Sequence, residues 1–273
     1  MGRALFSLDG SVAVVTGALG LLGRHHCAAL AEAGAHIAVA DLDGARAAAF
    51  AADLEQSLGT RAVGHRVDVT DATSVAALGR FVEDNLGPVD VLVNNAAIDD
   101  RFVADPLGDP PGRFEQYDLG RWRAMVDANL TGTFLVCQVI GSAMARRRRG
   151  SIINVASTYG IVAPDQSLYI QDDGTQAFFK GPAYPASKGG VVSFTRFLAT
   201  YWGPRGVRVN ALLPGGVKNG QDPFFITKYA QRTPLGRMAE PIDYKGALVF
   251  LASDASSYMT GANLVVDGGW TAW

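Results

Sequence analysis

Val12-Ala13-Val14-Val15-Thr16-Gly17-Ala18-Leu19-Gly20-Leu21-Leu22-Gly23 is the stretch that decides the fold of this chain. An apolar, β-branched run leads into three glycines and then into a helical pattern, and Asp41 ends the next apolar run. Glycines permit a tight turn and a close approach of the backbone to a pyrophosphate, which the amino end of the helix attracts. Asp41 can accept hydrogen bonds from ribose hydroxyls. The stretch therefore predicts a dinucleotide-binding unit.

Asp41 also indicates which dinucleotide is bound. A carboxylate repels a 2′-phosphate, and Ala40, Leu42 and Asp43 supply no cation to accommodate one. We therefore expect NAD rather than NADP. The residues expected to contact it in this part of the chain are Gly17, Gly20, Leu22, Gly23, Asp41 and Leu42.

Strand-like runs alternate with stretches of helical periodicity along the rest of the chain. The strand-like runs are 12–16, 36–41, 62–67, 89–93, 151–156, 207–213 and 263–267, and the helical stretches are 21–33, 44–58, 71–86, 119–145, 183–202 and 240–253. This alternation predicts an α/β fold, a Rossmann-like doubly wound parallel sheet of about seven strands with helices on both faces. The length of 273 residues and the hydrophobic content of 48% suit a single domain spanning 1–273.

Three segments interrupt the alternation, and each follows a strand at the carboxyl edge, where such sheets bind ligands. Segments 98–118 and 214–233 are expected to be substrate-side loops. Segment 158–181 contains Leu168-Tyr169-Ile170-Gln171 and Gln176-Ala177-Phe178-Phe179 around Asp172-Asp173-Gly174, which predicts an inserted β-hairpin. It is expected to act either as a lid over the reacting groups or as a surface or subunit contact.

Tyr184 and Lys188 are the candidate catalytic pair. They stand four residues apart in Tyr184-Pro185-Ala186-Ser187-Lys188, so a helix places both side chains on one face. We expect the cation to lower the phenol pKa and make the phenol a proton donor. Ser157 precedes Tyr184 by 27 positions (184 − 157), and the insertion lies between them.

With these motifs assembled, the chain resembles the short-chain dehydrogenase/reductase family over nearly its whole length. The segments that carry the resemblance are Asp68-Val69, Asn94-Asn95-Ala96-Ala97, Asn129 in Asp127-Ala128-Asn129-Leu130, Asn154-Val155-Ala156-Ser157, Tyr184-x-x-x-Lys188, Pro214-Gly215 and Val266-Asp267-Gly268-Gly269. The usual family glycine pattern has a glycine at the position of Leu21, and the spacing found here resembles the family's longer branch of epimerases and dehydratases.

The resemblance implies a proton relay and a set of cofactor contacts. Ser157 is expected to hydrogen-bond the reacting oxygen, Tyr184 to exchange a proton with it, Lys188 to hold the nicotinamide ribose, and Asn129 to position a water leading to solvent. Further cofactor contacts are expected from Asp68, Val69, Asn95, Ala96, Ala97, Tyr184, Lys188, Pro214, Gly215 and Val217. Family members commonly form tetramers, so a homotetramer, or failing that a dimer, is expected.

The function expected from these motifs is NAD-dependent interconversion of a secondary alcohol and a ketone. The candidate substrate residues are Arg101, Asp165, Gln166, Tyr169, Phe178 and Lys180. Their polar and aromatic mixture indicates a hydroxylated substrate such as a sugar, a sugar acid or an activated sugar. Two alternatives stay open: an epimerase or dehydratase that retains its NAD, and a dinucleotide-binding sensor or scaffold without turnover.

Charge and composition argue against other classes of partner. Twenty-four basic residues against 26 acidic ones give a net charge of −2, so neither nucleic acid nor an anionic membrane is expected. The run Arg146-Arg147-Arg148-Arg149 ends a predicted helix, where cations complement the helix dipole. Two cysteines in helical patterns predict neither a disulfide nor a metal site. With no signal-like start and no apolar run of membrane-spanning length, a cytoplasmic protein is expected.

Overall fold

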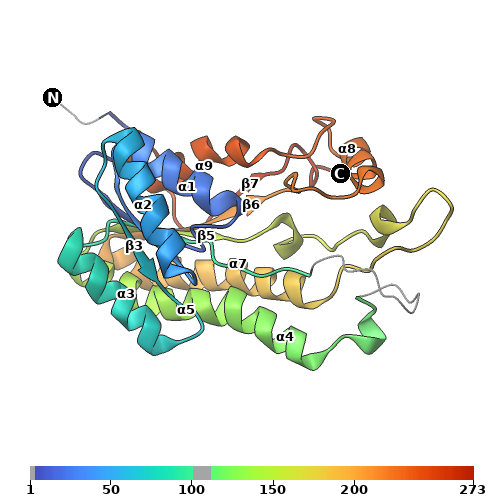
Figure 1. Ribbon diagram of the computed structural model, residues 1–273, viewed down its shortest axis with the longest axis horizontal. Helices are drawn as coiled ribbons and strands as arrows, with labels where there is room; N and C mark the ends of the chain where they lie inside the picture. Colours follow the sequence, from blue (N-terminus) through green and yellow to red (C-terminus); the bar gives the residue numbers. More distant parts are fainter. Residues whose placement is uncertain (1–3, 101–111) are drawn as a thin grey trace.

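The computed structural model describes residues 4–100 and 112–273, which form a parallel sheet between two layers of helices (Figure 1). The sheet has seven strands in the order β3-β2-β1-β4-β5-β6-β7. They are β1 (Val12–Thr16), β2 (His36–Asp41), β3 (Ala62–Arg66), β4 (Val91–Asn94), β5 (Gly150–Val155), β6 (Val207–Pro214) and β7 (Asn263–Val266). The order reverses beside β1, which confirms the predicted doubly wound α/β fold.

Helices cover both faces of this sheet. They are α1 (Leu21–Glu32), α2 (Gly44–Leu58), α3 (Ala72–Asn85), α4 (Leu119–Val126), α5 (Gly132–Val136), α6 (Ser142–Arg147), α7 (Ala183–Trp202), α8 (Pro223–Arg232) and α9 (Lys245–Ala252). Side chains of α1, α2 and α9 form one buried core with the sheet, and those of α3, α5, α6 and α7 form a second. Figure 1 shows these two sets on opposite sides of the strands.

The elements labelled α4, α5 and α6 belong to one helix, Leu119–Arg147, interrupted by π-helical turns at Asp127–Thr131 and Cys137–Gly141. By length and composition this 29-residue helix could cross a membrane, since an 18-residue window has a mean hydropathy of 1.3. That corrects the expectation that no stretch is long and apolar enough. Half of the window is buried, and the helix packs on α3 and α7, so its apolar face is accounted for by the core.

Several element boundaries differ from the predicted ones, and two of the differences have clear local reasons. The predicted helix 240–253 begins as a 3₁₀ turn, Pro241–Tyr244, in which Glu240 and Asp243 form a capping box, and the α-helix starts only at Lys245. Strand β4 starts at Val91 rather than at residue 89, because its pairing with β1 begins there.

A chain of buried amides connects the sheet to α7. The Asn94 side-chain amide donates to Asn154 Oδ1 at 2.8 Å, and the Asn154 amide donates to Thr195 Oγ1 at 2.9 Å. These three side chains belong to β4, β5 and α7. Buried polar groups are costly unless paired, so this chain specifies how α7 sits on the two central strands.

The insertion 158–181 contains the predicted hairpin in a shortened form. Around the turn at Gly174, the Gln171 N–H donates to the Thr175 carbonyl at 2.8 Å and the Ala177 N–H donates to the Tyr169 carbonyl at 2.9 Å. Gln166–Tyr169 forms a 3₁₀ turn, because the Asp165 carboxylate accepts the Ser167 backbone N–H at 2.9 Å and caps it. Leu168 and Tyr169, which are predicted to begin the first strand of the hairpin, therefore lie in this 3₁₀ turn. A single antiparallel bridge, Ile170 with Gln176, remains on either side of the predicted glycine turn.

The insertion packs against α8 and the carboxyl-terminal residues instead. Leu168, Tyr229, Met238 and Trp270 are buried together, with Tyr169, Phe225 and Ile226 partly buried around them, and we call these seven residues the aromatic cluster. The Tyr229 and Trp270 rings stack with centroids 4.1 Å apart. An ion pair between Asp165 and Arg232 and a hydrogen bond from Lys228 to the Ile170 carbonyl connect the insertion to α8.

Candidate active site

The turn after β1 is held against the segment that follows β4. Gly17 has a φ of +61°, and a Cβ there would lie 2.6 Å from the Ala96 Cα. The Asn95 amide donates to the carbonyls of Thr16 at 3.1 Å and of Gly17 at 2.9 Å. Only glycine fits this contact, so the first glycine of the motif is required by both conformation and space.

The amino end of α1 suits an anionic group. Gly20 caps the helix without any side-chain hydrogen bond, which leaves the first backbone N–H groups of the helix without a side-chain acceptor. A Cβ at Gly23 would lie 2.2 Å from the Gly17 carbonyl oxygen, so the turn cannot widen there. Free N–H groups at a compact glycine turn fit the pyrophosphate of a dinucleotide.

Asp41 lies at the carboxyl end of β2, where a ribose is expected. Its Oδ2 accepts the Leu19 backbone N–H at 2.9 Å, so this carboxylate also supports the glycine turn. Leu42 is exposed beside it. Just beyond the end of the next strand, β3, Asp68 accepts from the Thr70 N–H at 2.9 Å and the Thr70 hydroxyl at 2.7 Å, and these bonds lower the pKa of Asp68.

The fold brings together Ser157, Tyr184 and Lys188. Ser157 follows the carboxyl end of β5, and the other two residues lie in the first turns of α7. The Tyr184 hydroxyl hydrogen-bonds the Ser157 side chain. Lys188 Nζ donates to the Val155 carbonyl at 2.8 Å and lies 5.8 Å from the Tyr184 ring centroid. The 26 residues between Ser157 and Tyr184 therefore do not separate these groups in space.

The pKa of Tyr184 differs from the expectation. Burial raises it, the Asp99 carboxylate raises it further, and the Ser157 hydrogen bond lowers it, so the predicted lowering by Lys188 does not occur. Burial also lowers the pKa of Lys188 to about 8. The physical reason is that both groups are desolvated and the ammonium is directed at the Val155 carbonyl. Tyr184 is therefore a neutral phenol at neutral pH, with a proton to donate.

Asn129 holds the segment after β4 in place. It lies in the first π-helical turn, and its Oδ1 accepts the Ile98 N–H at 2.8 Å while its Nδ2 donates to the Ile98 carbonyl at 3.0 Å and to Ser187 Oγ at 3.0 Å. π-Helical turns often occur at functional sites, because the extra residue redirects a side chain. The expected role of Asn129 in a water relay stays a prediction.

The turn at Pro214-Gly215 is fixed from two sides. A Cβ at Gly215 would lie 2.8 Å from the Asp267 Cα, so the turn is pressed against the segment after β7. The next residue, Gly216, donates its N–H to the Tyr229 hydroxyl at 2.6 Å. The turn expected to flank the nicotinamide is thus attached to the aromatic cluster. Val217 forms a bridge with Ala239 just beyond it.

Four of the candidate substrate residues bind other parts of the insertion or its neighbours. Asp165 pairs with Arg232, and Gln166 bonds both backbone groups of Lys180, donating at 3.0 Å and accepting at 2.9 Å. Tyr169 stacks on Phe225 with centroids 5.1 Å apart, and Phe178 is buried edge-on against Tyr169. Their contact with a substrate stays a prediction, and Arg101 lies outside the described residues.

Lys180, the remaining candidate, reaches Tyr184. Its Nζ lies 4.8 Å from the Tyr184 ring centroid and pairs with the Asp99 carboxylate. Sequence reasoning missed Asp99, although it follows directly on Asn94-Asn95-Ala96-Ala97-Ile98 and could have been found by extending that motif. It also missed Tyr159, which is hydrogen-bonded to Tyr169 and whose pKa is raised by burial.

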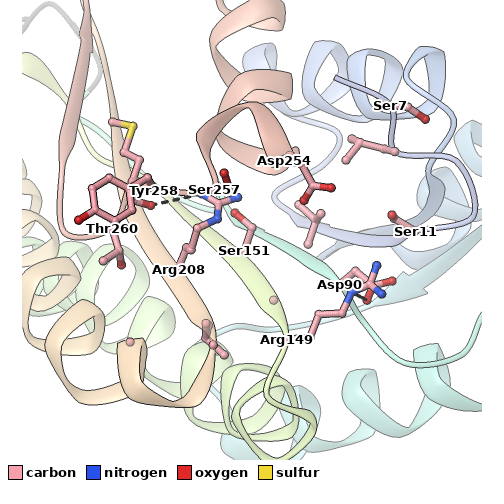
Figure 2. Close-up of a pocket in the computed structure, with 18 residues that line it drawn as sticks. Ser7, Ser11, Asp90, Arg149, Ser151, Arg208, Asp254, Ser257, Tyr258 and Thr260 are labelled. Carbon is pink, nitrogen blue, oxygen red and sulfur yellow. Dashed lines mark hydrogen bonds and ion pairs between the residues drawn. The ribbon is translucent and has the colours of Figure 1, made fainter. Parts of the chain in front are cut away.

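A cavity of about 590 Å³ lies at the opposite, amino edge of the sheet, lined by the first residues of β5 and β6 (Figure 2). Three of its charged groups bind one another or the backbone: Arg149 pairs with Asp90 at 3.3 Å, and Arg208 donates to the Leu251 carbonyl at 2.9 Å. Tyr184 and Lys188 do not line it. Within 4–100 and 112–273, no group of three His, Cys, Asp or Glu residues could hold a metal ion.

Comparisons with known proteins identify the family of this chain. The family profile described as Enoyl-(Acyl carrier protein) reductase matches residues 17–271. The chain therefore belongs to the short-chain dehydrogenase/reductase family, and its relatives support the shorter dehydrogenase branch rather than the longer branch suggested by the glycine spacing.

Three similar proteins illustrate the family. D-Threitol dehydrogenase of Mycolicibacterium smegmatis is 39% identical over 97% of this chain and 95% of its own length. Galactitol 2-dehydrogenase (L-tagatose-forming) of Cereibacter sphaeroides is 36% identical over 99% of each chain. A crystal structure of a gluconate 5-dehydrogenase from Burkholderia cenocepacia, in complex with NADP and tartrate, superposes with a TM-score of 0.86 at 31% identity over 98% of each chain. The chain is thus an oxidoreductase of the alcohol and ketone type.

Proposed function

We propose that this chain is an NAD-dependent dehydrogenase of secondary alcohols that acts on a polyol, a sugar or a sugar acid. The observation that carries the proposal is the meeting of Ser157, Tyr184 and Lys188 at the same carboxyl edge of the sheet as the glycine turn. A proton donor, an oxygen-binding hydroxyl and a buried cation lie together at the edge of the sheet where a dinucleotide fits.

The residues of the chain have separable roles in this reaction. NAD, when bound, supplies the nicotinamide ring that exchanges hydride with the substrate carbon. Ser157 hydrogen-bonds the substrate oxygen and orients it toward Tyr184. In reduction, Tyr184 gives its proton to that oxygen as the alcohol forms. In oxidation, Tyr184 must first lose its proton, so alcohol oxidation is expected to become faster as pH rises.

The preference for NAD is supported by Asp41 and opposed by one nearby cation. Asp41 presents a carboxylate where a 2′-phosphate would lie. Arg66 is the register partner of Asp41 across β2 and β3, a neighbour that inspection of residues 40–43 alone does not find. The hydrogen bond from the Leu19 N–H holds the Asp41 carboxylate in position, where it would repel a 2′-phosphate. We therefore propose NAD as the cofactor.

The substrate class is supported by the names of the relatives. Threitol and galactitol are polyols, and gluconate is a sugar acid. All carry several hydroxyls beside the reacting carbon. The described part of the substrate side offers matching hydrogen-bonding groups in Tyr159, Asp99 and Ser157.

We also propose that the protein is a cytoplasmic homotetramer. Phe194, Phe197 and Tyr201 form a stacked row along α7, with ring centroids 6.3 Å and 5.6 Å apart, and Phe134 of α5 lies beside it. Phe134, Phe197 and Tyr201 are exposed, and an apolar row of this kind suits burial between copies of the chain. Cys27 and Cys137 are both buried free thiols, which suits a reducing compartment.

NADH absorbance tests the proposed function. The wild-type protein is assayed with NAD and, separately, with NADP across polyols, sugars, sugar acids, nucleotide sugars and simple cyclic alcohols. We expect stoichiometric NADH from at least one polyol or sugar. We expect Tyr184→Phe, which keeps the ring and removes the proton, to lose about 10²- to 10⁴-fold in kcat while binding NAD normally.

Other results would contradict specific parts of this proposal. An epimerase or dehydratase would convert substrate without accumulating NADH. Higher catalytic efficiency with NADP than with NAD would overturn the cofactor assignment. Full turnover by Tyr184→Phe would remove Tyr184 from the chemistry. Light scattering on the same preparation tests the tetramer, which a monomer would disprove.

A further inference from the structure

Asp99 and Lys180 form an ion pair next to the Tyr184 ring, although they come from two segments far apart in the chain. Asp99 follows β4, and Lys180 ends the insertion. Their side chains form an ion pair, and Lys180 Nζ lies 4.8 Å from the Tyr184 ring centroid. The Lys180 side chain is only 8% exposed, whereas that of Asp99 is 44% exposed. The carboxylate is therefore the accessible member of the pair.

Side-chain amides hold the backbone at each residue of the pair or directly before it. Asn129 bonds the N–H and the carbonyl of Ile98, the residue before Asp99, at 2.8 Å and 3.0 Å. Gln166 bonds the N–H and the carbonyl of Lys180 at 2.9 Å and 3.0 Å. A group fixed in this way before the substrate arrives loses little entropy on binding it. The pair is thus a prebuilt part of the site.

The charge of Asp99 acts on the reacting groups. Its carboxylate raises the pKa of Tyr184 and of Lys188, and it also raises those of Tyr159 and Tyr169. Together with the 4.8 Å approach of its partner Lys180 to the Tyr184 ring centroid, these effects place the Asp99 carboxylate near the reacting groups. The neighbouring Asp100 is turned away, because it binds the Tyr117 hydroxyl at 2.9 Å and Arg121 at 3.1 Å.

An ionised carboxylate only accepts hydrogen bonds, and it binds hydroxyl groups well. Lys180 is already paired with this carboxylate, so its ammonium offers no unbalanced positive charge to a substrate carboxylate. A substrate carboxylate placed here would instead meet the negative charge of Asp99. The pair consequently favours a neutral hydroxylated group and disfavours an acidic one.

We propose that Asp99, held by Lys180, is a specificity-determining residue that accepts a hydrogen bond from the hydroxyl next to the reacting carbon. The substrate class that follows is the neutral vicinal polyol, with sugar acids excluded. This inference rests on the proposed function, since it names the substrate of that same site. Lys180 contributes by orienting and partly neutralising the carboxylate.

The test compares a polyol with its own acid. Catalytic efficiency is measured with threitol against threonate and with galactitol against galactonate, for wild type, Asp99→Asn, Lys180→Gln and Glu32→Gln. Glu32 is the matched control: its carboxylate is 48% exposed and pairs with Lys245 at 2.6 Å on α1 and α9, outside the catalytic groups. Circular dichroism verifies that each variant is folded.

We expect wild type and Glu32→Gln to prefer the polyol of each pair. Asp99→Asn should lose about tenfold to a hundredfold in kcat/KM for the polyol, as expected for one hydrogen bond to a charged group. It should gain activity on the acid, because Lys180 is then unpaired. Lys180→Gln should lower activity on the polyol without any gain on the acid, because the carboxylate stays negative.

An unchanged ratio of polyol to acid efficiency in Asp99→Asn, relative to Glu32→Gln, overturns the inference. So does a wild-type preference for the acid. Titration calorimetry of threitol and threonate into each protein with NADH separates this inference from the proposed function. Asp99-dependent polyol binding without turnover by wild type would sustain the inference and remove the proposed function, whereas turnover with no dependence on Asp99 would do the reverse.

Discussion

The carboxyl edge of the sheet has two regions that are built differently. On the nucleotide side, around the glycine turn, backbone packs against backbone, whereas on the substrate side, in the region of the insertion and α8, side chains from distant segments pack against one another. Gly17 lies against Ala96 with no room for a Cβ. Tyr229 of α8 stacks on Trp270 near the carboxyl terminus, and Tyr169 of the insertion stacks on Phe225. The first kind of contact is fixed by a motif of a few residues. The second can change with a single side chain, which makes the substrate side the adjustable part of the molecule.

Among the variants that test this difference, Trp270→Ala is expected to have the largest effect, on both stability and substrate binding. Removing a buried aromatic side chain should lower the free energy of unfolding by about 3–5 kcal/mol, because it leaves a cavity beside Tyr229. Since Tyr229 binds Gly216, KM for the substrate should also rise. Chemical denaturation and steady-state kinetics measure both quantities.

The matched control for that change is Trp273→Ala, because Trp273 is 77% exposed. We expect it to alter stability by no more than about 0.5 kcal/mol. If both variants were equally stable, the aromatic cluster would not be what holds the substrate side. If Trp270→Ala weakened NAD binding as much as substrate binding, the two sides would not be separable.

Gly17→Ala probes the nucleotide side and should have an intermediate effect. A left-handed backbone costs a non-glycine residue about 1–2 kcal/mol, and crowding against Ala96 adds about 1–3 kcal/mol. Gly59→Ala is the control, since Gly59 has a similar φ of +66° but no atom within 4 Å of its added Cβ. The dissociation constant of NAD should rise in the first variant alone, and equal values in both would show that the close approach to Ala96 is unimportant.

The buried cation of the catalytic centre should produce the smallest effect, visible as a dependence on pH. The pKa of Lys188 is about 8 in the folded protein and 10.5 when exposed. Between these values the unfolded chain binds more protons, so the free energy of unfolding should rise with pH, by at most about 1.4 kcal/mol per unit. Below pH 8 the full cost of burying the ammonium is present.

Denaturation of wild type and of Lys188→Met between pH 8 and about 10 isolates the contribution of Lys188 to the free energy of unfolding. Exposed tyrosines ionise above this range. The difference in stability between wild type and the variant should become more favourable to wild type as pH rises. A difference independent of pH would mean that Lys188 has an ordinary pKa, and that burial does not set its proton affinity.

The sequence predicted the nucleotide side well because its information is local. The glycine turn, the Asp41 position and the alternation of strands and helices all follow from patterns within about 30 residues. Even so, the motif spacing pointed partly toward the wrong branch of the family. Leu21 occupies an expected glycine position and is an exposed first residue of α1, where a side chain is tolerated.

The substrate side was harder to predict because its contacts connect segments far apart in the chain. The Asp165 cap turns the predicted strand at Leu168 into a 3₁₀ turn, and Leu168 then packs on α8, 61 positions before Tyr229 (229 − 168). The pairing of Asp99 with Lys180 spans 81 positions. The effect of burial on Tyr184 was also missed, because the depth of a side chain depends on everything packed around it.

The buried amides of Asn94 and Asn154 have a mechanical consequence for α7, which carries Tyr184 and Lys188. Because Asn154 donates to Thr195, α7 cannot slide along β4 and β5, or turn about its own axis, without leaving buried polar atoms unpaired. Tyr184 and Lys188 therefore behave as part of the rigid frame of the sheet. Any motion that admits the substrate or releases the product is therefore expected in α8 rather than in α7, while Tyr184 and Lys188 remain stationary.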